Sequence, residues 1–86
     1  MKISVEISMY PLDQNYEPPI IDFIKRLNRH ATLQIKTNTM STQIFGEYDT
    51  VMSALSQEIK ESFGAERKVS MVMKILNADG SGEYIP

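Results

Sequence analysis

The 86-residue chain contains no cysteine and a single histidine, His30. The absence of cysteine excludes disulfides, thiolate chemistry and cysteine metal sites, and it is typical of a protein in a reducing compartment. One histidine supplies too few ligands for a metal site, and no Ser-His-Asp set can be assembled around it. We therefore interpret His30 as a surface residue at a helix end, and we expect a non-enzymatic protein without catalytic residues, metal or cofactor.

The chain also lacks long apolar runs and an excess of charge. No apolar run approaches the ~20 residues that a membrane span requires, and Met1 and Lys2 lead directly into an alternating segment rather than a signal-peptide core. Nine basic residues face eleven acidic ones, for a net charge of −2, which does not favour binding to DNA or RNA. We expect a cytoplasmic protein that binds neither membrane nor nucleic acid.

Four segments alternate apolar and polar residues with the period of two that is typical of a strand with one buried face. The first is 2–10, with Ile3, Val5, Ile7 and Met9 on one side. The others are 32–38, 40–45 and 67–76, and we expect Asn38-Thr39 to be a short turn that joins 32–38 and 40–45 into a hairpin. For 40–45 we assign Met40, Thr42 and Ile44 to the core, and we expect Gly46 to break the strand.

Two segments have helical spacing instead. One begins near Pro19, because proline is tolerated in the first turn, and ends between Asn28 and His30. The second runs from about Asp49, which can cap it, to Phe63, with a stripe of Val51, Met52, Leu55, Ile59 and Phe63. We expect Gly64 to close this helix in a left-handed conformation.

The order β-α-β-β-α-β predicts one α+β domain over residues 1–86, a ferredoxin-like sandwich. Both helices would cover one face of a four-stranded antiparallel sheet whose first and third strands are central. The other face would be open and of mixed polarity, and a second copy of the chain could cover it. We therefore expect a homodimer or homotetramer formed through the sheets, with residues 78–86 a flexible or subunit-swapped tail.

A group of hydroxyl side chains near the end of the first strand and the hairpin is the candidate binding site. Its members are Ser8, Tyr10, Thr37, Ser41 and Thr42. Threonine is common in strands, so good β-propensity alone explains much of this group. The alternative is a shallow pocket whose hydroxyls read the donors and acceptors of a small heterocycle, with Tyr10, Tyr16 or Phe45 as a stacking face.

Three short motifs resemble the thiamine-binding, YkoF-like family. They are Ser8-Met9-Tyr10-Pro11-Leu12, Thr37-Asn38-Thr39-Met40-Ser41-Thr42, and Gly46 followed by Tyr48-Asp49-Thr50-Val51-Met52. The resemblance extends from about residue 2 to residue 77. It implies a ferredoxin-like fold, assembly into dimers or tetramers, and binding of thiamine or its hydroxymethylpyrimidine moiety in vitamin uptake or salvage.

The resemblance places the ligand at Ser8 and Tyr10 of the first strand and at Ser41 and Thr42 of the hairpin. The cationic thiazolium of thiamine would be favoured by Glu6 or Glu47 and by an aromatic ring. A second hypothesis remains open, in which the chain is an oligomeric interaction or regulatory module without a small-molecule ligand.

Overall fold

The computed structural model describes residues 1–65 and 68–82. Within these residues the elements are β1 (Lys2–Pro11), α1 (Glu17–Leu27), β2 (Gln34–Thr37), β3 (Thr42–Glu47), α2 (Tyr48–Ala65) and β4 (Val69–Leu76). Their order confirms the predicted β-α-β-β-α-β pattern and a ferredoxin-like α+β fold. The described part of the last strand begins at Val69, so Arg67 of the predicted strand lies outside the described residues.

The four strands form one antiparallel sheet in the order β2-β3-β1-β4. As predicted, β1 and β3 are central and β2 and β3 form a hairpin. The register places Val5 opposite Ile44 on one side and opposite Ile75 on the other. Because paired residues point to the same face of a sheet, the apolar residues of the strands form one continuous surface.

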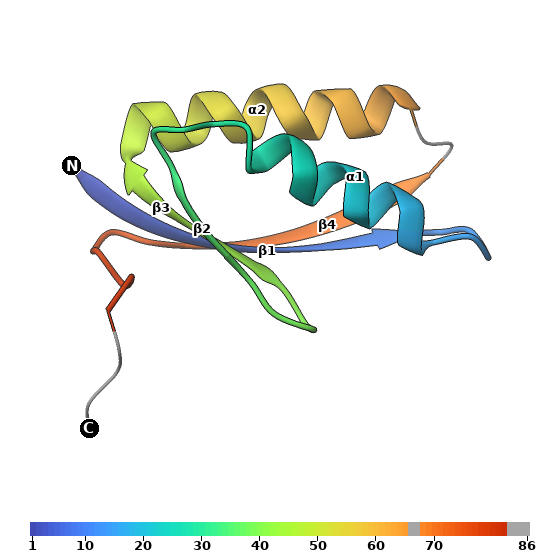
Figure 1. Ribbon diagram of the computed structural model, residues 1–86, viewed down its shortest axis with the longest axis horizontal. Coiled ribbons are helices and arrows are strands. Elements are labelled where there is room, and N and C mark those ends of the chain that lie inside the picture. Colours follow the sequence, from blue (N-terminus) through green and yellow to red (C-terminus); the bar gives the residue numbers. More distant parts are fainter. Residues whose placement is uncertain (66–67, 83–86) are drawn as a thin grey trace.

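Both helices lie on this apolar face of the sheet (Figure 1). Ile3, Val5, Ile7 and Met9 of β1 pack there against Phe23 and Leu27 of α1 and against Val51 and Leu55 of α2. Pro18 and Pro19 lie in the first turn of α1, where a missing backbone N–H disrupts no helical hydrogen bond. The predicted face of β1 is therefore the core face.

Three predictions about the stretch from β3 to α2 were wrong. Gly46 does not break β3; it lies inside the strand opposite Ile3. Since α2 begins at Tyr48, directly after β3, Asp49 lies in the first turn of the helix and does not precede it as a cap. Gly64 continues α2 as far as Ala65, and no described glycine has a positive φ.

The assignment of Met40 to the core was also wrong, because Met40 is 85% exposed. The turn of the hairpin is longer than the sequence indicated: Asn38 Oδ1 accepts hydrogen bonds from the backbone N–H groups of Met40 and Ser41. The strand therefore starts at Thr42. Thr42 and Ile44 are buried as predicted.

The second face of the sheet carries no helix, and part of the C-terminal segment lies across it. Ser4 Oγ donates to the carbonyl oxygen of Ala78 and accepts from the N–H of Gly80, at 2.7 and 2.6 Å. Lys36 Nζ donates to the carbonyl oxygen of Ser81 and also lies 5.6 Å from the centre of the Phe45 ring. Ala78, Gly80 and Ser81 of the predicted tail thus contact the sheet of their own chain. Residues 83–86 of that tail lie outside the described residues.

Candidate ligand-binding site

A cavity of about 490 Å³ lies where the end of β1, the first half of α1 and the β2–β3 hairpin meet. The apolar part of its wall comes from Ile7 and Met9 of β1 and from Ile20, Phe23 and Ile24 of α1. Phe23 and Ile7 also belong to the hydrophobic core, so the cavity is an extension of the core that reaches the surface.

The cavity exists because β3 separates from β1 before β1 ends. The pairing of β1 with β3 ends at Ile7 and Thr42, whereas the pairing of β1 with β4 continues to Pro11. Figure 1 shows the hairpin bending away from β1 towards its tip. In an antiparallel sheet the backbone N–H and C=O groups of successive residues point in turn to the strand on one side and to the strand on the other. Between Ser8 and Pro11, at least one residue of β1 therefore directs both of these groups into the gap left by β3.

The hydroxyls on the helix side of the sheet belong to the two threonines of the hairpin. Thr37 and Thr42 are opposite one another in the register, and their Oγ1 atoms are 3.2 Å apart. Thr42 also lies opposite Ile7, and its residue is 4% exposed. A hydroxyl has one donor and two acceptor positions, so this pair retains capacity to bind a polar ligand group.

The hydroxyls of Ser8 and Ser41 belong to the open side of the sheet. Ser8 Oγ donates to the carbonyl oxygen of Met40, at 3.3 Å, across the gap between β1 and the hairpin. Ser41 Oγ donates to Glu6 Oε2, at 3.0 Å, and Lys74 Nζ lies 3.3 Å from Glu6 Oε1. The Ser41 hydrogen bond, followed by the hydrogen bond and charge of Lys74, holds the pKa of Glu6 below its ordinary value. Glu6 is therefore ionised at neutral pH.

All five residues of the candidate site line this one cavity, but their hydroxyls do not converge from one side. Ser8 and Tyr10 point to the open face, because their neighbours Ile7 and Met9 point to the core. Thr42 points to the helix face. The gap beside β1 joins the two sides, which is why residues from both faces share a cavity. Whether these residues bind a ligand remains a prediction.

Phe45 and Glu47, which the sequence also suggested for ligand binding, lie away from the cavity. Of the three aromatic residues considered, Tyr10 and Tyr16 line the cavity, whereas Phe45 lies opposite Ser4, under Lys36. Glu47 binds the N-terminal ammonium group of Met1 at 2.9 Å, at the other end of β3. Of the two acidic residues considered for a cationic ligand, only Glu6 contacts a cavity residue.

The sequence did not single out the apolar wall. Ile20 and Ile24 have the helical spacing of ordinary core residues, and nothing in their pattern shows that they face a cavity. The role of Asn38 in shaping the hairpin was also missed. Asparagine is common in turns because its side chain binds backbone groups about two residues further along the chain, and Asn38 between two alternating segments was the signal that could have identified this role.

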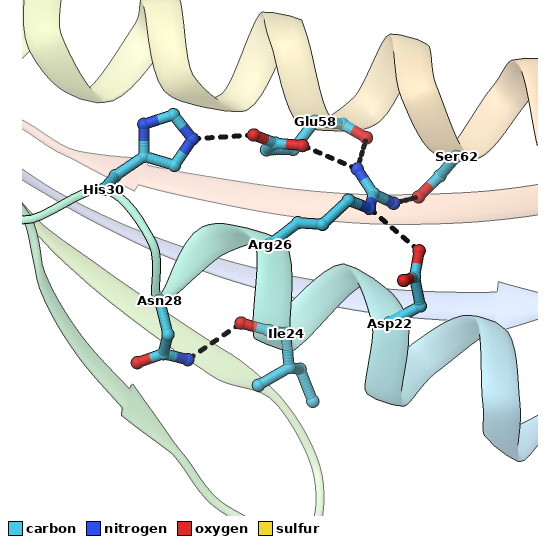
Figure 2. Close-up of polar contacts among 7 residues, drawn as sticks. All are labelled: Asp22, Ile24, Arg26, Asn28, His30, Glu58 and Ser62. Carbon is cyan, nitrogen blue, oxygen red and sulfur yellow. Dashed lines mark hydrogen bonds and ion pairs between the residues drawn. The ribbon is translucent and has the colours of Figure 1, made fainter.

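A second polar group, between α1 and α2, is structural (Figure 2). Arg26 donates from Nη1 to Oε1 and to the carbonyl oxygen of Glu58, from Nη2 to Ser62 Oγ, and from Nε to Asp22 Oδ2. His30 Nε2 lies 2.7 Å from Glu58 Oε2. His30 is thus half-buried and paired, rather than the free surface residue that we expected.

This network also corrects the predicted stripe of α2. The buried residues of the helix are Val51, Ala54, Leu55, Glu58 and Ser62. Phe63, which we assigned to the stripe, is 52% exposed. In the last turns of α2 the buried side is the one that faces Arg26 of α1. Glu58 and Ser62 lie on that side, because a buried guanidinium needs hydrogen-bond acceptors.

Within the described residues no group of three or more histidine, aspartate or glutamate side chains is placed to hold a metal ion. No helix in the described part of the chain is long and apolar enough to cross a bilayer.

The fold and the cavity together define a small α+β protein with a ligand-sized cavity at the hairpin end of its sheet. Residues 5–83 match the family described as thiamine-binding protein. Since the match extends over nearly the whole sequence, the chain belongs to this family. The resemblance inferred from the three motifs is thereby confirmed, as is a general thiamine-related role. No curated protein matches the chain.

Solved structures show the same fold at low sequence identity. A hypothetical protein from Methanocaldococcus jannascii is 21% identical with a TM-score of 0.78, over 98% of this chain and 88% of that one. A domain of unknown function, DUF77, from Bacillus cereus is 16% identical with a TM-score of 0.70, over 99% and 84%. A candidate thiamine biosynthesis or salvage protein from Thermotoga maritima is 15% identical with a TM-score of 0.66, over 99% and 91%.

Proposed function

We propose that this protein binds thiamine or its hydroxymethylpyrimidine moiety in the cavity beside β1, without catalysing a reaction, as part of uptake or salvage of the vitamin in the cytoplasm. The observation that carries the proposal is the coincidence of a ligand-sized cavity with two of the family-like motifs, Ser8-Met9-Tyr10-Pro11-Leu12 and Thr37-Asn38-Thr39-Met40-Ser41-Thr42. The walls consist of aliphatic, aromatic, hydroxyl and amide groups, which is the composition of a binding pocket.

The chemistry of an aminopyrimidine supports this proposal. Its ring nitrogens accept hydrogen bonds and its exocyclic amine donates them. Thr37 and Thr42 can do both, and the edge of β1 adds backbone groups from the gap. Tyr10 and Tyr16 supply aromatic faces for a flat ring. The thiazolium of intact thiamine is a cation, and Glu6 lies behind Ser41 on the open side.

Isothermal titration with thiamine and with hydroxymethylpyrimidine tests the proposal. We expect binding by the wild type and a loss of affinity of about two- to tenfold in Thr42→Val, since one hydrogen bond contributes about 0.5–1.5 kcal/mol. Thr42→Val keeps the shape of the side chain and removes only its hydroxyl. Ser56→Ala, which removes an exposed hydroxyl from α2, is the matched control and should bind normally. The absence of heat with both ligands at millimolar concentration would refute the proposal.

We further propose that the chain forms a homo-oligomer through β4 and the open side of the sheet. β4 is an edge strand, and from Val72 onward it exposes apolar residues on both faces: Val72 and Leu76 on the open face, Met73 and Ile75 on the helix face. Long apolar edges are seldom left uncovered in stable monomers. Antiparallel pairing of two β4 strands would cover them.

Light scattering distinguishes this assembly from a monomer. Ile75→Lys should dissociate the oligomer, whereas Ile21→Lys, at an equally exposed isoleucine of α1, should not. A monomeric wild type at micromolar concentration would contradict the proposal. The same exposed strand favours the second hypothesis, an interaction or regulatory module without ligand. That hypothesis predicts that Ser8→Ala and Thr42→Ala change only the stability of the oligomer.

A further inference from the structure

None of the described residues that line the cavity carries a charged side chain at neutral pH. Three of them, Tyr10, Tyr16 and Phe23, are aromatic, and the polar groups belong to serine, threonine, asparagine and tyrosine. Phosphate sites in proteins instead combine arginine or lysine side chains with free backbone N–H groups. The described part of this wall therefore suits a neutral or cationic ring and offers none of the cationic side chains that phosphate sites use.

Tyr16 and Ile20, at the start of α1, line the cavity, but this end of the helix is poorly equipped to bind an anion. An α-helix leaves its first four backbone N–H groups unpaired, and these groups attract anions. In α1 the first turn contains Pro18 and Pro19, which have no N–H, so two of these donors are missing. Glu17 adds a negative charge to the same turn. The remaining donors belong to Tyr16 and Glu17.

Among the described residues, the charged side chains that contact the wall or adjoin it in the chain offer no free cation to an anion. Glu6 contacts Ser41 of the wall, and its partner Lys74 neutralises that charge rather than contributing a free cation. Asp13 follows Leu12 of the wall, and its carboxylate accepts the N–H of Asn15 in the same loop. The carbonyl oxygen of Lys68 accepts a hydrogen bond from the N–H of Leu12, with the two heavy atoms 3.0 Å apart, and Lys68 is not among the described residues that line the cavity.

From these three features we infer that the cavity accepts the unphosphorylated forms of its ligand and rejects the corresponding phosphate esters. This inference rests on the proposed function and specifies its ligand class as alcohols, namely thiamine and hydroxymethylpyrimidine. A phosphate monoester carries a charge of about −1.5 to −2 at pH 7. Burying that charge beside an apolar wall without a cationic partner is unfavourable. The protein would thus act before the phosphorylation step that traps or activates such an alcohol.

The test compares each alcohol with its own phosphate ester by isothermal titration at one ionic strength. The probes are thiamine, thiamine monophosphate, hydroxymethylpyrimidine and hydroxymethylpyrimidine phosphate. We expect each ester to bind at least about tenfold more weakly than its alcohol, a difference of about 1.4 kcal/mol. If an alcohol binds and its ester binds equally well or better, the inference is refuted and the proposed function stands. If neither alcohol binds, the proposed function fails.

A gain of affinity tests the physical cause. Leu12→Lys places a cation at an exposed position of the wall, where leucine is 68% exposed, and should reduce the preference for the alcohol at least about threefold by attraction of the phosphate. Phe63→Lys adds the same charge at an exposed position of α2 outside the wall, and it should leave the preference unchanged. Equal preferences in the wild type and in Leu12→Lys would refute the absence of a cation as the cause of the preference, and with it the physical argument for the inference.

Discussion

Replacement of Glu58 by leucine should destabilise the protein strongly, because it leaves Arg26 buried without its main partner. Arg26 and Glu58 are only 9% and 6% exposed, and Arg26 Nη1 lies 2.7 Å from Glu58 Oε1. Breaking such a pair by removing one partner costs about 3–5 kcal/mol. Arg26 keeps its bonds to Asp22 and to the carbonyl oxygen of residue 58, so we expect the lower end, about 3 kcal/mol.

This loss is large for so small a domain. At about 0.05–0.15 kcal/mol per residue, the free energy of unfolding of the whole chain is about 4–13 kcal/mol. A loss of about 3 kcal/mol should lower Tm by about 12–24 °C. Urea and thermal unfolding followed by circular dichroism measure both quantities. Glu61→Leu makes the same change at an exposed position of α2 and should shift Tm by only a few degrees.

The double variant Arg26→Met/Glu58→Leu isolates the interaction. Removing both charges avoids an unpaired buried ion, and such replacements are often neutral or stabilising. We therefore expect the double variant to be more stable than Glu58→Leu alone. If Glu58→Leu lost less than about 1 kcal/mol, or if the two single changes added without coupling, the reasoning from burial would be refuted.

Acid should also destabilise the protein, and reversibly, through protonation of Glu58. Burial acts to raise the pKa of Glu58, but hydrogen bonds from His30 and Arg26, with their charges, outweigh it and leave the pKa below its ordinary value. A carboxyl group whose pKa is lower in the folded state binds fewer protons there than in the unfolded state. Its contribution to stability is therefore complete above the unfolded pKa of about 4.3 and is lost as the pH falls through the folded pKa. Urea unfolding at pH 7 and below pH 4 should show this decline, and it should be smaller in the double variant.

Two glycine substitutions test close contacts that the fold requires. In Gly46→Ala the new Cβ would lie 3.2 Å from Val51 Cγ2, and we expect a loss of about 1 kcal/mol, measured by urea unfolding; unchanged stability would contradict the tight packing of α2 on β3. In Gly80→Ala the new Cβ would lie 3.1 Å from Ser4 Oγ, which should detach residues 78–82 from the sheet. Hydrogen exchange should then speed up at residue 80 without a change in Tm, and unaltered exchange would argue against this contact.

The sheet could be predicted from the sequence because the alternation of apolar and polar residues within each strand identifies its buried face. The alternation in residues 2–10 separates Ile3, Val5 and Ile7 from Ser4 and Glu6, and a period of two allows no other division of faces. The pairs Ser4–Phe45 and Glu6–Gln43 accordingly lie on the open face, as predicted. Local patterns were sufficient here because the relevant geometry repeats within a few residues.

Predictions were weaker where contacts between distant segments decide. Met40 fits the alternating pattern of Thr42 and Ile44, but its backbone N–H donates to Asn38 Oδ1, so Met40 belongs to the turn and not to the strand. Phe63 has the spacing of the apolar residues of α2, but the buried residue at this end of the helix is Ser62, which accepts a hydrogen bond from Arg26 of α1. Apolar periodicity identifies a face of a helix, but it does not show that a charged side chain of another helix will need acceptors on that face.

The sequence by itself determined the order of the elements, the buried and open faces of the sheet, and the residues from which a binding site had to be chosen. Only the tertiary structure decided that these residues surround one cavity from two sides of the sheet. The cavity depends on β3 leaving β1 after Ile7 while β4 stays paired to Pro11. How far each pairing extends along β1 depends on strands that are far apart in the chain. The local pattern of residues in β1 therefore does not predict where the pairing with β3 ends.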